Sequence, residues 1–174
     1  MYSFLEKIMQ KQKLVSVYDE IDRPGSSWAG YVAAVNEEHI VLSCISPNGI
    51  PDGLLLLPVQ KVFRVEEESR YLEKIKRLSA GLKAESPKLS GNLAVALFDY
   101  AKKNRYIVSI EFNDSGNNDI IGYVEQYTED ECEIAQISED GLKDGQTVFL
   151  TEHITQISCN GQQEKNIRRL NMGE

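Results

Sequence analysis

The strongest constraint on the fold is an internal repeat, in which the second half of the chain follows the pattern of the first. The halves align when the sequence is shifted by 92 positions, which brings Gly30-Tyr31-Val32 onto Gly122-Tyr123-Val124, Glu37 onto Glu129, Ile45-Ser46 onto Ile137-Ser138, Gly49 onto Gly141, Asp52-Gly53 onto Asp144-Gly145, and Arg77-Leu78 onto Arg169-Leu170. A one-residue gap extends the match forward, to Val15-Ser16 with Val108-Ser109 and Phe4-Leu5 with Leu97-Phe98. Because the glycines and the apolar positions keep one register, we interpret the chain as a tandem duplication.

The repeat predicts a domain organisation. We place the first copy at residues 1–78 and the second at residues 92–174. Between them, residues 79–91 contain Gly81, Pro87 and Gly91, which disfavour regular structure. This segment is therefore interpreted as a linker.

Each copy is predicted to hold a short helix, five strands and a closing helix, from helical spacing and from runs of β-branched and aromatic residues. In the first copy the helix carries Phe4, Leu5, Ile8 and Met9, the strands are 14–18, 28–35, the alternating Ile40, Leu42 and Cys44, 54–57 and 59–65, and the closing helix is 69–78. In the second copy a helix near 93–101, with Ser90 or Asn92 as N-cap, precedes strands 106–112, 120–127, Cys132 with Ile134, 147–150 and 154–159, and a closing helix lies around Ile167 and Leu170. Asn48-Gly49 and Asp52-Gly53 are expected to form turns.

Short, closely spaced strands with a glycine inside the second one, Gly30 or Gly122, are typical of a small barrel. We therefore expect a mainly β protein with flanking helices, made of two tandem five-stranded SH3-type barrels, each preceded by a short helix. Two cores of this size are modest, so the copies are expected to pack together or the protein to oligomerise.

The charge of the chain is unevenly distributed. The formal net charge of −8 arises wholly in residues 91–174, which hold 7 Lys+Arg and 15 Asp+Glu, whereas residues 1–90 hold 12 of each. An acidic chain lacks the broad basic footprint that nucleic-acid binding requires. RNA is therefore disfavoured as a general partner, although a local basic patch stays open.

The cysteine pattern bears on the compartment. Cys44, Cys132 and Cys159 have no paired spacing, and no export signal precedes them, which favours reduced thiols in the cytoplasm. The longest compact apolar run, at residues 54–57, has the length of a strand. We expect a cytoplasmic protein without a membrane partner.

The sequence offers no set of residues that suggests catalysis, a metal site or a cofactor. The acidic cluster of Glu129, Asp130, Glu131 and Glu133 could bind a cation, but a solvated hairpin turn is the preferred interpretation. His39 and His153 have no other ligand residues at suitable spacing. The expectation is a non-enzyme without metal or cofactor.

Basic residues cluster near predicted helix ends. The candidates for contact with RNA or an acidic partner are Lys102, Lys103, Arg105, Lys74 and Arg77. The alternative interpretation is that these cations complement the helix dipole. Trp28, the single tryptophan, is expected to anchor the core or an interface, with a partner-contact role as the other candidate.

This order of elements, with a glycine in the bent second strand, resembles the Sm-like branch of the small SH3-type barrels. Residues 147–157 are similar to the fourth and fifth strands of the bacterial Sm-like RNA chaperone. The Asp-Gly loop and the ending Tyr71, Ile75, Leu78 also resemble uncharacterised Firmicutes proteins. In Sm-like proteins strand four of one barrel pairs with strand five of the next, so the resemblance implies a homo-oligomer formed through barrel edge strands.

The chain departs from the Sm pattern at its RNA-binding positions. Six residues after the bend glycine, where Sm proteins have Asp or Asn, stand Asn36 and Thr128. The Arg-Gly pair after strand four is replaced by Leu57-Pro58 and Leu150-Thr151. RNA binding at the usual inner site is therefore not expected. The leading hypothesis is a non-catalytic assembly or partner-binding module, and the alternative is an RNA-binding regulatory protein that uses the basic patch near the linker.

Overall fold

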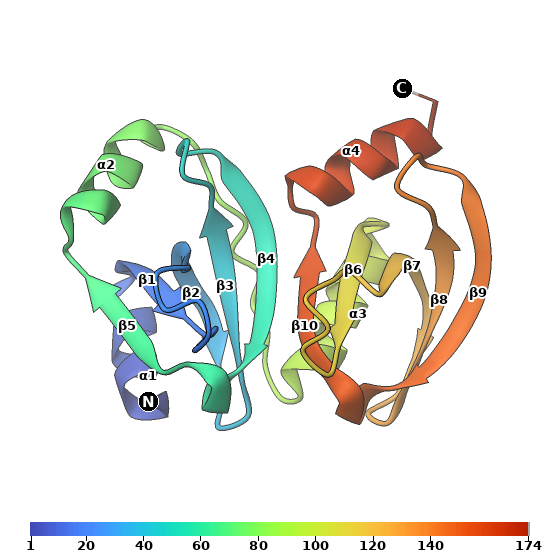
Figure 1. Cartoon of the computed structure of the whole chain (residues 1–174), viewed down its shortest axis with the longest axis horizontal. Helices are drawn as coiled ribbons and strands as arrows, with labels where there is room; N and C mark the ends of the chain where they lie inside the picture. The colour runs from blue at the N-terminus through green and yellow to red at the C-terminus, as the bar shows by residue number, and fades with distance from the viewer. Residues whose placement is uncertain (174) are drawn as a thin grey trace. The chain divides into compact units, whose positions relative to one another are not determined.

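The computed structural model describes residues 1–173, and the chain divides into two compact units, Met1–Leu89 and a second unit that begins at Ser90. Both units have the same order of elements: a helix, four strands, a single 3-10 turn, a fifth strand and a closing helix (Figure 1). No helix among residues 1–173 is long and apolar enough to cross a membrane.

The first unit has two helices, five strands and one 3-10 turn. They are α1 (Tyr2–Lys11), β1 (Leu14–Tyr18), β2 (Trp28–Val35), β3 (His39–Ile45), β4 (Pro51–Pro58), η1 (Val59–Lys61), β5 (Arg64–Glu67) and α2 (Arg70–Leu78). Ser69 caps α2, because its side chain accepts a hydrogen bond from the Leu72 backbone N–H.

The second unit repeats this series. Its elements are α3 (Leu93–Asn104), β6 (Ile107–Phe112), β7 (Ile120–Tyr127), β8 (Glu131–Ile137), β9 (Lys143–Leu150), η2 (Thr151–His153), β10 (Ile154–Cys159) and α4 (Gln162–Asn171). Of the two N-caps considered for α3, the structure uses Asn92, whose side-chain oxygen lies 3.1 Å from the Val95 nitrogen.

The ten strands are antiparallel to their neighbours, and within each unit the fifth strand pairs with the first. The order is β5-β1-β2-β3-β4 in the first unit and β10-β6-β7-β8-β9 in the second. The fourth and fifth strands therefore stand at opposite ends of each unit's order. The mainly β architecture with flanking helices is as expected, but the hydrogen bonding within a unit forms an open, curved sheet and does not close a barrel (Figure 1).

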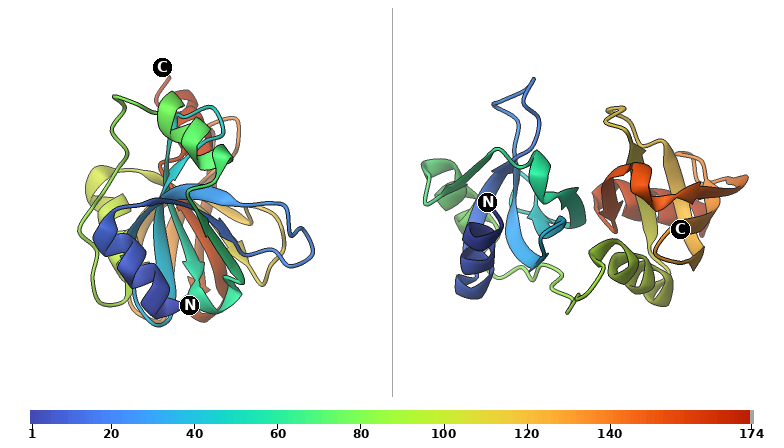
Figure 2. Two further views of the ribbon diagram at one scale, coloured as in Figure 1. Left: turned by 90° about the vertical axis from the view of Figure 1, so that its left-hand side faces the viewer. Right: turned by 90° about the horizontal axis from the view of Figure 1, so that it is seen from below.

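In the first unit the two helices cover opposite faces of the sheet. Leu5 and Ile8 of α1 pack into a core cluster that contains Val15 and Val17, whereas α2 packs against Leu14. Successive strand residues point to opposite faces, so Leu14 packs in the cluster on one face and Val15 packs in the cluster on the other. The left view of Figure 2 shows α1 and α2 at separate places on the first unit. Each fully buried Leu or Ile contributes about 1.5–3 kcal/mol of hydrophobic stabilisation.

The second unit follows the same plan. Leu97 and Phe98 of α3 are fully buried, and this helix contacts β7 and β10. Ile167 of α4 belongs to a separate cluster with Ile107 and Ile121, with Tyr123 packed against it. The position of α4 over β6 forms the pocket described below.

Two strand predictions were wrong in their bounds. The fifth strand expected at 59–65 is interrupted by the 3-10 turn η1, and β5 begins only at Arg64. The fourth strands begin earlier than expected, because Asp52-Gly53 lies inside β4 and not in a turn. Gly53 has a φ of +71°, and the β3–β4 register shifts beside it, so this glycine forms a bulge within the pairing. Gly145 repeats the feature in β9, with a φ of +84° and a similar shift.

Residues that match between the two halves also contact one another within each unit. A Cβ atom on Gly49 would lie 2.4 Å from the Cβ of Leu78, and one on Gly141 would lie 2.6 Å from the Cβ of Leu170. The β3–β4 and β8–β9 loops therefore approach the last residues of α2 and α4 too closely for a side chain. This contact explains why a glycine and a helix end recur together in the sequence.

Candidate functional sites

The three basic residues predicted near the linker lie together at the C-terminal end of α3. Lys102 and Lys103 lie in the last turn of α3, and Lys103 forms a 2.6 Å ion pair with Asp99. The Lys103 hydrogen bond lowers the pKa of the Asp99 carboxyl. Arg105 is the left-handed C-cap of α3, and its guanidinium lies 5.7 Å from the centroid of the Tyr123 ring. Two of the three side chains, Lys103 and Arg105, are therefore already engaged in contacts within the second unit.

Lys74 and Arg77, the candidates of the first unit, lie on the exposed surface of α2. They line a shallow pocket of about 600 Å³ together with Arg70, Glu73 and Leu78. Glu73 places a carboxylate among these cations. The arrangement has a net positive charge and lacks an aromatic ring in its lining.

Trp28 is half-buried and packs against the main core of the first unit. Its indole Nε1 donates a 3.1 Å hydrogen bond to Oδ1 of Asp19. Burial raises the pKa of the Asp19 carboxyl, and the charge of Lys61 opposes this shift. Trp28 thus contributes to the core of the first unit, and its ring is part-exposed.

The second unit contains a cationic pocket that the prediction did not identify, which we call the α4 pocket. Its volume is about 420 Å³, and it is lined by Tyr106, Asn160, Lys165, Arg168, Arg169 and Met172. The last four residues are spaced i, i+3, i+4 and i+7, so they share one face of α4. Among residues 1–173, no ion pair joins Lys165, Arg168 or Arg169 to a carboxylate.

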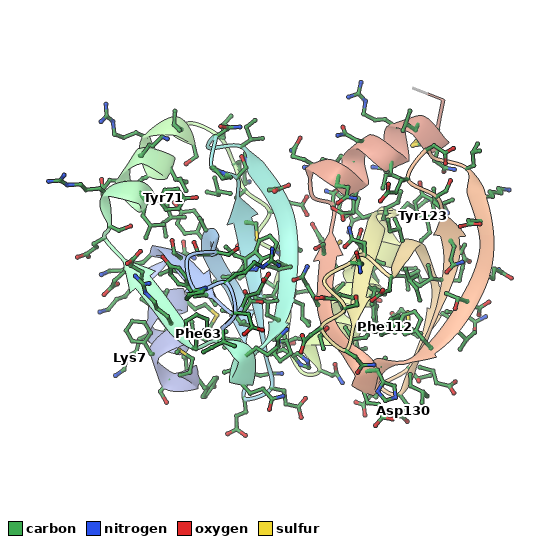
Figure 3. All side chains as sticks on the ribbon, in the orientation of Figure 1. Lys7, Phe63, Tyr71, Phe112, Tyr123 and Asp130 are labelled. Carbon is green, nitrogen blue, oxygen red and sulfur yellow. The ribbon has the colours of Figure 1, made fainter. Side chains whose placement is uncertain are left out.

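Aromatic rings order one wall of the α4 pocket. The Arg168 guanidinium lies 5.7 Å from the centroid of the Tyr106 ring, a favourable cation–π distance. Tyr100 meets Tyr106 edge to face, with ring centroids 5.8 Å apart. Tyr123, which lies on the α4 side of the sheet (Figure 3), donates a 3.2 Å hydrogen bond to the Asn171 side chain. These contacts limit the rotamers of the lining side chains.

A buried carboxylate holds α4 in place. Glu164 is only 4% exposed, and its Oε1 accepts a 2.5 Å hydrogen bond from the Ser109 hydroxyl of β6. Its Oε2 accepts a 2.9 Å hydrogen bond from the Gly161 backbone N–H at the start of the helix. Both oxygens are therefore engaged within the fold. Within residues 1–173, no ion pair joins Glu164 to the cations of α4.

The first unit has a pocket of about 510 Å³ at the matching place, but carboxylates offset most of the positive charge of that pocket. Its lining is Lys11, Gln12, Lys13, Leu14, Tyr31, Glu68, Leu72, Glu73 and Lys76. Lys13 lies 2.9 Å from Glu67 and 2.8 Å from Glu68. The hydrogen bond between Lys13 and Glu68 raises the pKa of the lysine and lowers the pKa of the glutamate. The lining thus contains three lysines and two glutamates in the first unit, and three cations without a carboxylate among residues 1–173 in the second.

Sequence reasoning missed Tyr106 and Lys165. It counted basic residues that are adjacent in the chain, whereas Lys165 joins Arg168 and Arg169 through helical spacing. That periodicity is visible in the sequence and could have identified the cationic face. Tyr106 comes from the start of β6, 59 positions before Lys165, and no local pattern links the two.

A second candidate site is the free edge of β9. Val148 and Leu150, two residues apart on this strand, are 62% and 45% exposed. The residue of β4 that matches Val148 is Leu56, which is 1% exposed. The side chain of Ser43, opposite Leu54 in the β3–β4 pairing, donates to the backbone oxygen of Glu85, so the segment after α2 passes this face of the first sheet. The fourth strand is covered in the first unit and exposed in the second.

The acidic cluster is a hairpin turn, as preferred. The hydroxyl oxygen of Thr128 accepts hydrogen bonds from the backbone N–H groups of Asp130 and Glu131. The Asp130 side chain lies at the tip of the β7–β8 hairpin (Figure 3). No group of three or more potential metal ligands converges anywhere in residues 1–173.

Comparisons with family models, with curated proteins and with solved structures find no match to this chain, so the geometry described above carries the functional argument.

Proposed function

We propose that this protein is a non-catalytic assembly module built from two Sm-like SH3-type barrel units, whose free edge strands pair between copies of the chain. In this proposal the fourth strand of one chain's second unit, β9, pairs with the fifth strand of another chain's first unit, β5. The pairing supplies the contact that the Sm-like resemblance implies.

The exposed apolar edge of β9 is the observation that carries the proposal. Val148 and Leu150 project to solvent from a strand whose only neighbour in the second unit is β8. An exposed strand edge presents unpaired backbone groups and is a template for pairing with another strand. The matching residue Leu56 is buried, which indicates that this position of the fold is suited to being covered.

The other end of the proposed contact is β5. This strand of four residues pairs only with β1 and stands at the end of its unit's strand order. Two different surfaces would meet, so the contact is head-to-tail. Such heterologous contacts generate closed rings, or filaments when the rotation does not close.

RNA binding by Lys102, Lys103 and Arg105 is the weaker proposal. Lys103 is paired with Asp99, and the Arg105 guanidinium lies over Tyr123. To bind an RNA phosphate, Lys103 would have to leave Asp99, or Arg105 would have to leave Tyr123.

Light scattering across a concentration series tests the assembly. We expect the mass to rise in multiples of the 19.6 kDa chain, because edge pairing is an intermolecular equilibrium. Val148→Lys places a charge on the exposed face of β9, which should return the protein to a single-chain mass at the same concentrations.

Leu82→Lys is the matched control, because Leu82 is an exposed leucine outside the edge strands. Its mass distribution should equal that of the unmodified protein. A constant mass of one chain at every concentration would rule out the proposal, as would equal effects of the two lysine substitutions.

A further inference from the structure

We propose that the α4 pocket of the second unit binds a small phosphate-bearing ligand of the mononucleotide class, with the phosphate held by Lys165, Arg168 and Arg169 and the base placed against the Tyr106–Arg168 pair. This inference does not depend on edge-strand assembly, because it concerns other residues and another surface of the unit.

The first step of the argument is the charge of the pocket. Three cations lie on one face of α4, and within residues 1–173 the lining contains no carboxylate. Like charges at helical spacing repel one another and destabilise the helix. The half of the chain that carries all the net negative charge nevertheless keeps this cluster. An anionic ligand would relieve the repulsion.

The matching pocket of the first unit serves as an internal comparison. There Glu73 stands at the position of Lys165, and Glu68 at the position of Asn160. Lys13, which pairs with two glutamates, stands at the position of Tyr106. The charges of Arg168 and Arg169 recur in the first unit as Lys76 and Arg77. The second unit differs in that two glutamates are absent from the lining and that Lys165 and the aromatic ring of Tyr106 are present.

The kind of cation favours phosphate. Two of the three side chains are arginines, whose planar guanidinium groups match phosphate oxygens in a bidentate manner. The helical dipole at this end of α4 complements the cations when the pocket is empty, but it accounts for neither Tyr106 nor Asn160. A phosphate monoester, with a charge of about −1.5 to −2 near neutral pH, balances most of the charge of the lining.

The aromatic wall indicates what the phosphate is attached to. Tyr106 is held edge-on by Tyr100, and Arg168 lies over its ring, so a flat surface is already ordered. Bases stack on aromatic rings and on guanidinium planes, a contribution of about 1–3 kcal/mol per base. The pocket volume of about 420 Å³ lies at the small end of the range for ligand sites, roughly 300–1,000 Å³. A single nucleotide fits both features.

Calorimetric titration of the full chain at low salt provides the test, with AMP, adenosine and inorganic phosphate as probes. We expect AMP to bind at least tenfold more tightly than either adenosine or inorganic phosphate, because only AMP engages both walls. Arg168→Gln should weaken AMP binding at least tenfold, since this side chain contributes to both the charge and the stack.

Lys76→Gln changes the matching position of the first unit and is the control. It should leave AMP binding unchanged, and circular dichroism should show both variants folded. The proposal fails if AMP does not bind at millimolar concentration, if AMP binds no better than inorganic phosphate, or if the Lys76 variant weakens binding equally. Binding of single-stranded RNA oligomers without binding of AMP would also overturn it. None of these outcomes alters the mass measurements that test edge pairing.

Discussion

Each unit buries a serine at the same position, and the two serines differ in their hydrogen bonding. Ser16 of β1 and Ser109 of β6 occupy matching positions and are almost fully buried. Ser109 donates to Glu164, whereas the residue that matches Glu164 is the apolar Leu72. Within residues 1–173 the Ser16 hydroxyl has no hydrogen-bond partner. A buried polar group without a partner destabilises a fold, while a satisfied one contributes to stability.

Replacing each serine with alanine should therefore have opposite effects. Ser109→Ala is expected to lower the free energy of unfolding by about 1–3 kcal/mol, because a buried Glu164 oxygen loses its donor. Ser16→Ala should be neutral or raise stability by up to about 1 kcal/mol, since it removes an unsatisfied group. Urea unfolding followed by circular dichroism measures both changes. A loss of stability in the Ser16 variant equal to that in the Ser109 variant would contradict this account.

At the scale of elements, one glycine in each unit allows the second strand to lie close to the third. A Cβ on Gly30 would stand 2.4 Å from the Ser43 carbonyl oxygen, and one on Gly122 would stand 2.1 Å from the Ala135 carbonyl oxygen. Both distances are far inside van der Waals contact with backbone atoms, which cannot rotate away. A glycine within a strand marks a sharp bend or a close backbone approach, and the close approach is present in β2 and in β7.

Gly122→Ala should destabilise the second unit by about 1–3 kcal/mol, the usual cost of overpacking a well-packed site. Its matched control is Gly25→Ala in the β1–β2 loop, where an added Cβ meets nothing within 4 Å. That change should alter stability by no more than about 0.5 kcal/mol. Thermal denaturation of both variants provides the comparison. Equal melting temperatures for the two variants would show that the strands can separate at no cost.

At the scale of the whole molecule, the three cysteines are buried, and none forms a disulfide within residues 1–173. Burial raises the pKa of the Cys132 thiol to about 12, and it raises the pKa of Cys44 further. At pH 8 a thiol with that pKa is ionised in roughly one molecule in 10,000, and the thiolate is the reactive form. The cysteines thus act as small core residues, as the sequence indicated, and report on the integrity of both units.

The folded protein should accordingly react with less than one equivalent of a thiol reagent such as Ellman's reagent at pH 8. In 6 M guanidinium chloride all three cysteines should react, because unfolding exposes them and restores their ordinary pKa values. Absorbance at 412 nm counts the thiols directly. Rapid labelling of one or more thiols in the folded state would show that a unit opens readily.

Local signals in the sequence were sufficient for most elements. Ser69 and Asn92 cap helices because an N-cap depends on the few residues around it. Strand β10 begins and ends where its β-branched residues predicted. The fifth strand of the first unit was misplaced, because Val59, Val62 and Phe63 favour a strand. Residues 59–61 instead turn as η1, and β5 pairs with β1 from Arg64 onward. Local sequence patterns likewise could not predict whether each sheet closes into a barrel. Closure depends on whether strands far apart in the sequence form hydrogen bonds with each other.

The sequence by itself determined the repeat, the order of elements and the place of the buried glycines, since periodicity and turn chemistry act over a few residues. Only the tertiary structure decided which repeated positions differ in chemistry. Tyr106 and Arg168 are 62 positions apart in the chain, and they form one wall only because α4 packs over β6. Val148 is exposed whereas the matching Leu56 is buried, and this difference also arises only when the chain is folded. Contacts between distant segments set charge balance and burial, and therefore set the sites proposed for this protein.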